Sequence, residues 1–246
     1  MFASNLKRRV FLRHIVSAIV SAAALASCGT AAFRKDGSRL SSDFSLFSLI
    51  KTDIDMVAEV HFQETYANLR TLMRKLYRRN PKEWRKTAHP DGDAVVFLVF
   101  DTEHDWRFKE LENKKGADAI HLAFREDYQG DRVLAFIVGL ITMNLSAYND
   151  KSEFFVLDDL SPQKLYNSAR NVEIAAWKLA NGRDAKGNLY LLSNEMDGTL
   201  NNLSFEREFG KIIAHQDTLA RIISEKTNRV IVRVIQTMAT AIFLPI

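Results

Sequence analysis

The chain has 246 residues and a formal net charge of +4, and only four of its residues are proline and ten are glycine. A single cysteine cannot form an intramolecular disulfide, so a disulfide-stabilised fold is excluded. Scarce proline and glycine also disfavour a β fold with many turns and favour a helical one.

The first 27 residues resemble an export signal. Their four basic residues lie before position 14, no acidic residue precedes Asp36, and an alanine-rich apolar stretch occupies 14–26. A charged segment followed by an apolar one is typical of a signal peptide. The apolar stretch is shorter than the roughly 20 residues that a stable membrane span needs.

The segment Leu25-Ala26-Ser27-Cys28 resembles the lipobox of bacterial lipoproteins. In that family a signal peptidase cuts before the cysteine, and the thiol accepts a diacylglycerol. The resemblance implies that Cys28 is lipidated, and two or more acyl chains hold a protein stably at a membrane. A plain secretory signal with an incidental cysteine, or a buried N-terminal helix, is the alternative. The lipobox is favoured because the only cysteine stands where cleavage would occur.

Residues 7–13, Lys-Arg-Arg-Val-Phe-Leu-Arg, resemble the twin-arginine export motif, although that motif usually begins with Ser or Thr. The resemblance implies export in the folded state, and general secretion is the alternative. Such a signal is an address that a receptor reads, not an anchor. Gly29 stands where an aspartate retains enterobacterial lipoproteins at the inner membrane. We therefore expect the lipidated protein to lie at the periplasmic face of the outer membrane.

The positive net charge belongs to the predicted signal. Residues 1–27 carry four of the 34 basic residues and no acid, so that 30 basic and 30 acidic residues remain after cleavage. A neutral mature chain has no overall basic field for nucleic acid, which we exclude as a partner. We expect 28–42 to be a linker and 43–246 to be one compact all-α domain, with at most a short strand or hairpin.

Apolar residues indicate helices in three segments of the first half of this domain. Apolar residues at three- and four-residue steps predict a long amphipathic helix over 44–79, which Asn80-Pro81 ends. The apolar run 94–100 suits either a buried strand or a buried helix, and we favour the helix because its flanks look helical. A further helix is expected over 116–128.

Capping residues define two helices in the second half. Asp131 is the predicted N-cap of a helix over 132–148, which is apolar almost all round and is the expected core helix. Ser161-Pro162 combines a serine cap with proline at the first helical position. The helix that begins there is expected to end at Asn181-Gly182.

The C-terminal region is expected to be mainly helical. A loop or hairpin over 183–202, with a strand-like patch at 189–192, precedes a long helix from about Ser204 toward Ile242. The stretch 230–246 is nearly apolar. We expect it to be buried in the core, because its 17 residues with an arginine among them would make a poor membrane span.

The densest polar group is formed by Asp101, Glu103, His104 and Asp105. Carboxylate oxygens suit hard divalent cations and imidazole suits zinc or iron. If the stretch is helical, Asp101, His104 and Asp105 share one face. This supports the hypothesis of a divalent metal site, and no other cofactor is predicted. The favoured alternative is a solvated acidic turn, because basic residues follow directly.

A second candidate is a basic face on the first predicted helix. Arg70, Arg74 and Arg78 recur at four-residue spacing and therefore share one side of it. Such a face would meet anionic lipid headgroups, lipopolysaccharide or an acidic partner. The favoured alternative is that the basic run pairs with the acidic stretch 91–105.

The remaining polar residues form no known catalytic motif. His61 falls on an apolar stripe, where a core histidine is expected, and His121 and His215 are isolated on predicted helices. We favour a non-enzymatic lipoprotein that presents its helical domain to the periplasm and binds a protein or an envelope component. One alternative is a metal-dependent enzyme or metal carrier that uses residues 101–105. Another is a carrier of apolar ligands between the helices 132–148 and 204–246.

Overall fold

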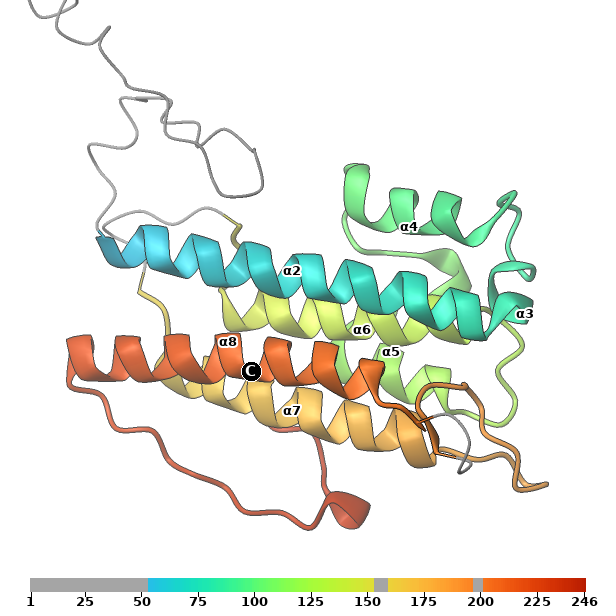
Figure 1. Cartoon of the computed structure of the whole chain (residues 1–246). Helices are drawn as coiled ribbons and strands as arrows, with labels where there is room; N and C mark the ends of the chain where they lie inside the picture. Colours follow the sequence, from blue (N-terminus) through green and yellow to red (C-terminus); the bar gives the residue numbers. More distant parts are fainter. Residues whose placement is uncertain (1–52, 153–158, 197–200) are drawn as a thin grey trace, which may run out of the picture. The chain divides into compact units, whose positions relative to one another are not determined.

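Seven α-helices account for most of what the computed structural model describes, residues 53–152, 159–196 and 201–246 (Figure 1). The predicted helical fold class is confirmed. The predicted signal, the lipobox at Cys28 and the linker 28–42 lie outside the described residues. None of the described helices is long and apolar enough to cross a membrane.

Four long helices pack together, and shorter elements surround them. The long ones are α2 (Asp53–Arg79), α6 (Arg132–Ala147), α7 (Pro162–Asn181) and α8 (Ser204–Thr227). The shorter ones are α3 (Pro81–Trp84), α4 (Gly92–Asp101), the 3-10 turn η2 (Lys109–Leu111) and α5 (Gly116–Ala123). The most extensive contacts join α5 to α6, α7 to α8 and α2 to α8. The helix predicted over 94–100 is confirmed as α4, whereas the one expected over 116–128 is shorter.

Local signals fix the ends of the helices much as the sequence predicts. The side chains of Asp131 and Ser161 each accept a hydrogen bond from the backbone N–H three residues later, so both predicted N-caps are confirmed. Helix α7 ends at Asn181, as predicted. Gly182 follows at φ −64°, outside the left-handed region. Glycine is needed there because a Cβ would lie 2.7 Å from the carbonyl oxygen of Lys178.

Helix α6 lies in the core, as its apolar composition predicts. Fourteen of its 16 residues are buried. Gly139 lets α5 come close, because a Cβ at this position would lie 2.6 Å from Ile120 Cγ1 and 2.8 Å from the carbonyl oxygen of Gly116. The contact between α5 and α6 therefore depends on a residue without a side chain.

The prediction for the C-terminal residues is wrong. Helix α8 ends at Thr227, and Asn228 follows in the left-handed conformation at φ 52°. Residues 229–246, which we call the C-terminal strap, are extended except for the 3-10 turn η3 (Met238–Thr240) and run back along α7 and α8 (Figure 1). Much of the strap is exposed rather than buried. Its run of valine and isoleucine disfavours helix and suits an extended backbone.

The predicted hairpin region contains little regular structure. The strands β1 (Glu195–Met196) and β2 (Asn201–Asn202) pair antiparallel over two residues each. The strand-like patch at 189–192 contributes one isolated bridge, between Leu189 and Arg183. The expectation of a short strand or hairpin is therefore met only by these small elements.

Buried carboxylates hold the start of α6. Asp131 accepts hydrogen bonds from the Leu134 N–H at 3.0 Å and from the Tyr77 hydroxyl at 2.7 Å. Burial raises the pKa of Asp131 to about 6. Glu83, also buried, accepts the N–H of Arg132 at 2.9 Å. These contacts tie the beginning of α6 to α2 and α3.

Two glycine substitutions test the packing of α6. We expect Gly139→Ala to lower the free energy of unfolding by roughly 1–3 kcal/mol, because the added methyl group overpacks the contact with α5. Gly210→Ala in α8 is the control, since a Cβ there meets nothing within 4 Å. It should stabilise by up to about 1 kcal/mol through helix propensity. Urea unfolding followed by circular dichroism measures both, and equal effects would contradict the close approach.

Asp131→Asn tests the buried carboxylate. The folded-state pKa of about 6 lies above the ordinary 3.8, so the folded state binds the proton more tightly. The stabilisation is present below about pH 4 and is lost as the pH rises through about 6. At roughly 1.36 kcal/mol per pKa unit the loss is about 3 kcal/mol. Asparagine keeps the cap without titrating. The difference in unfolding free energy between wild type and variant should therefore change across this window, and a constant difference would refute the assignment.

Candidate ligand-binding site

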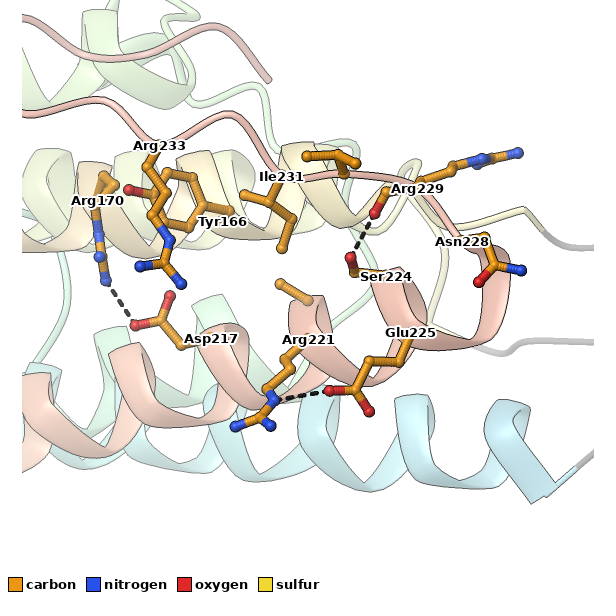
Figure 2. A pocket seen from close by; sticks show the side chains of 12 residues that line it. Tyr166, Arg170, Asp217, Arg221, Ser224, Glu225, Asn228, Arg229, Ile231 and Arg233 are labelled. Atoms are coloured by element: carbon orange, nitrogen blue, oxygen red, sulfur yellow. Dashed lines mark hydrogen bonds and ion pairs between the residues drawn. The ribbon is translucent and has the colours of Figure 1, made fainter.

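The C-terminal strap covers a cleft between α7 and α8 with a volume of about 980 Å³ (Figure 2). Helix α7 contributes Tyr166 and Arg170, α8 contributes a mixed row that includes Asp217 and Arg221, and the strap closes the third side. Four arginines and two carboxylates line the cleft, which is therefore net positive: Arg170, Arg221, Arg229, Arg233, Asp217 and Glu225.

Arg170 is the best-held cation of the cleft. Its guanidinium donates to Asp217 at 2.6 Å and lies 3.0 Å from Glu173. It also lies over the ring of Tyr166, 4.9 Å from the centroid. Burial alone would lower the pKa of Arg170, but the two carboxylates together outweigh this effect and raise the pKa above its ordinary value. The group therefore stays cationic on the wall that α7 provides.

Arg233 differs from the other arginines of the cleft. Its side chain points from the strap into the cleft, toward Asp217 and Tyr166 (Figure 2). No carboxylate forms an ion pair with Arg233 in the part of the chain that the structure describes. By contrast, Arg221 pairs with Glu225 at 2.9 Å. Arg233 therefore offers its guanidinium to whatever enters.

Polar contacts fix the start of the strap. Arg229 donates two hydrogen bonds to Asp159, at 2.8 and 2.7 Å. The hydrogen bonds from Arg229 hold the pKa of the Asp159 carboxyl below its ordinary value. The Ser224 hydroxyl donates to the carbonyl oxygen of Arg229. The strap therefore leaves α8 in a defined direction along the edge of the cleft.

Three amide side chains of α7 hold the rest of the strap by its backbone. Gln163 accepts the Val232 N–H at 2.7 Å and donates to the Val232 carbonyl oxygen at 3.1 Å. Asn171 does the same to Leu244, at 2.6 and 2.9 Å. Asn167 donates to the carbonyl oxygen of Pro245 at 2.8 Å.

The amides of Gln163, Asn167 and Asn171 lie at four-residue spacing and share one face of α7. We call them the amide row. The sequence shows this spacing, but polar residues opposite an apolar stripe are typical of a solvated helix face, and we did not identify them as functional. The signal that would have found them is that amides carry both a donor and an acceptor, which matches an extended backbone.

The structure does not bring the proposed metal ligands together. Helix α4 ends at Asp101, so the helical face that we supposed for Asp101, His104 and Asp105 does not exist. Asp101 pairs with Arg70, and Glu103 is exposed. Within residues 53–152, 159–196 and 201–246, no three His, Cys, Asp or Glu side chains are arranged to hold a metal.

The basic face of α2 is largely neutralised. Arg70 donates two hydrogen bonds to Asp101, and Arg74 lies 3.3 Å from Asp93. For these two residues the structure shows the alternative that we favoured, pairing with the acidic stretch. Arg78 is exposed, and none of the described carboxylates pairs with it.

The histidines have specific neighbours that the sequence does not reveal. His61 of α2 and His215 of α8 face each other, with their Nδ1 atoms 3.1 Å apart, so His215 is not isolated. Burial and the neighbouring His215 lower the pKa of His61. His121 packs edge-on against Phe243 of the strap, with ring centroids 5.2 Å apart. It therefore supports the far end of the strap.

A second cleft, of about 410 Å³, lies farther along the same groove. It is bounded by α7, α8 and Met238 of the strap, and its walls include Trp177 and Phe209. The apolar-carrier hypothesis instead placed a cavity between helices 132–148 and 204–246. The second of those helices ends at Thr227, so that arrangement does not exist as expected.

Comparison of the chain with protein-family models, with curated proteins and with solved structures gave no match.

Proposed function

We propose that the chain is a lipid-anchored protein of the bacterial cell envelope whose helical domain binds an anionic ligand in the cleft beneath the strap. The lipobox resemblance at Cys28 supports the anchor, and Gly29 supports the periplasmic face of the outer membrane. The observation that carries the binding role is the guanidinium of Arg233, which points into the cleft (Figure 2) and has no ion-pair partner among the described residues.

The charge of the cleft favours an anion. Three of the four lining arginines already have carboxylate partners. Arg233 pairs with none of the carboxylates that the structure describes, so its planar fork can bind a carboxylate or phosphate through two parallel hydrogen bonds. The surplus of arginine over acid attracts anions from solution. A cleft of about 980 Å³ is of the size that small-molecule ligands occupy.

The apolar part of the lining narrows the class of ligand. Ala220 and Ile231 lie beside the charged groups, so the cleft suits a ligand that carries an apolar portion next to its anionic group. Guanidinium groups recognise and orient such a ligand. For this reason we propose binding rather than catalysis, with an anionic component of the envelope as the partner.

Arg233→Gln tests the binding role. Phenyl phosphate serves as the probe in isothermal titration calorimetry, because it joins an anionic group to an apolar ring. We expect saturable binding by the wild type and about tenfold or greater weakening in the variant, the value of a lost charge-assisted hydrogen bond. Arg78→Gln removes an exposed arginine outside the cleft and is the matched control. Equal weakening by both variants, or no saturable binding by the wild type, would overturn the proposal.

Cys28→Ala tests the anchor. We expect the wild type in the membrane fraction of cells, with a mass that includes acyl chains, and the variant without acyl chains and released from the membrane. Ser27→Ala keeps a small residue before the cysteine and should remain lipidated. Tight membrane association of the unlipidated variant would refute the anchor. Export in cells that lack the twin-arginine translocase would refute only the folded route.

A further inference from the structure

The C-terminal strap has an inner and an outer face, and both are apolar. Ile231, Phe243 and Ile246 are partly buried against the core. The outer face carries branched aliphatic side chains with large exposed fractions: Val230 at 86%, Val232 at 67%, Ile235 at 99% and Ile242 at 73%. An extended segment that packs on a protein through one face normally turns polar residues outward. A row of exposed aliphatic side chains marks an interaction site.

The charged side chains of the strap are all basic. Residues 229–246 contain Arg229 and Arg233 and no aspartate or glutamate. Arg221 of α8, which lines the cleft beside the strap, is also largely exposed. Arg229 and Arg221 have carboxylate partners, and Arg233 points into the cleft (Figure 2). The exposed aliphatic side chains, in a segment without aspartate or glutamate, therefore suit the interface of a bilayer.

We propose that the outer face of the strap docks on the bilayer that carries the lipid of Cys28. This inference rests on the lipid anchor proposed above. The exposed aliphatic side chains would enter the boundary between headgroups and acyl chains.

The position of Cys28 makes a weak contact sufficient. Twenty-four residues separate Cys28 from Asp53, where α2 begins. Even a fully extended chain of this length spans no more than about 85 Å, so the domain cannot leave the neighbourhood of the membrane. Docking of an already tethered domain is intramolecular, and its effective concentration is far above that of a free protein.

Docking through the outer face is compatible with the cleft. Val232 is largely exposed, whereas the next side chain, Arg233, points into the cleft (Figure 2). The exposed aliphatic side chains and the guanidinium that enters the cleft therefore belong to different residues of the same segment. Membrane contact leaves the ligand-binding groups of the cleft free.

A fluorescent label at Ile235→Cys tests the docking. Cys28 is the only natural cysteine, so lipidated protein accepts a polarity-sensitive thiol label at position 235 alone. The lipidated full chain is reconstituted in vesicles of phosphatidylcholine, with and without phosphatidylglycerol. We expect a blue shift of the emission and loss of quenching by aqueous iodide in both kinds of vesicle, because burial of the aliphatic side chains drives the docking. Thr71→Cys in α2, also exposed, is the control and should stay accessible to iodide.

A second variant separates docking from general membrane proximity. Val230→Ser and Val232→Ser together shorten the apolar face without touching the core, and circular dichroism checks the fold. They should restore quenching at position 235. Full quenching of the label at position 235 in both kinds of vesicle would overturn the inference, because the outer face of the strap would then stay in water. Failure of the anchor itself is distinguishable, because an unlipidated Cys28 would take up a second label.

Discussion

The fold is governed by the burial of α6 on almost every side. A helix with 14 of 16 residues buried cannot lie on a surface, so other elements must surround it. Close approach at Gly139 brings in α5, and α2 and α7 cover other faces. The start of α6 is polar but satisfied, because Asp131 and Glu83 accept its first N–H groups. Without these acceptors, burial of that helix end would leave unpaired donors in the core.

One polar contact inside the bundle adds specificity to this packing. Gln216 of α8 donates to Asn144 of α6 and, at 3.0 Å, to Ser168 of α7, and all three side chains are buried. Apolar residues alone tolerate sliding of one helix on another, whereas a buried hydrogen bond is lost when the helices shift. The contact therefore fixes the register of α7 against α8. That register places Arg170 beside Asp217 and gives the cleft its shape.

The sequence predicts helix ends better than it predicts what lies beneath an apolar segment. Asp131, Ser161-Pro162 and Asn80-Pro81 act through local hydrogen bonds and backbone geometry, and the helices begin or end where these residues stand. The prediction of a buried C-terminal segment was wrong because an apolar run without periodicity does not show whether the neighbouring helices leave room for it. Asn228, left-handed and directly before the valine and isoleucine run, was the local signal that we missed.

The candidate site depends on pairs that are remote in the chain, and no spacing rule reveals them. His61 and His215 are 154 positions apart, and Gln163 meets Val232 across 69. Arg170 and Asp217 were unremarkable residues on two separate helices. The proposed metal ligands are not brought together for the opposite reason, because nearness in sequence was taken for nearness of side chains. The anchor at Cys28 stays a prediction, since it falls outside the described residues.

The amide row of α7 recognises the strap through its peptide groups. Gln163, Asn167 and Asn171 contact backbone N–H and C=O atoms, which every residue except proline offers in the same form. The path of the strap is thereby separated from the identity of its side chains. Among the strap residues that the amide row contacts, Val232 and Leu244 must keep an N–H donor. Because the amide row binds only the backbone of the strap, the side chains on the outer face can change without loss of these hydrogen bonds. The same helical domain can therefore acquire outer surfaces of different chemistry while the helices that hold the strap stay unchanged.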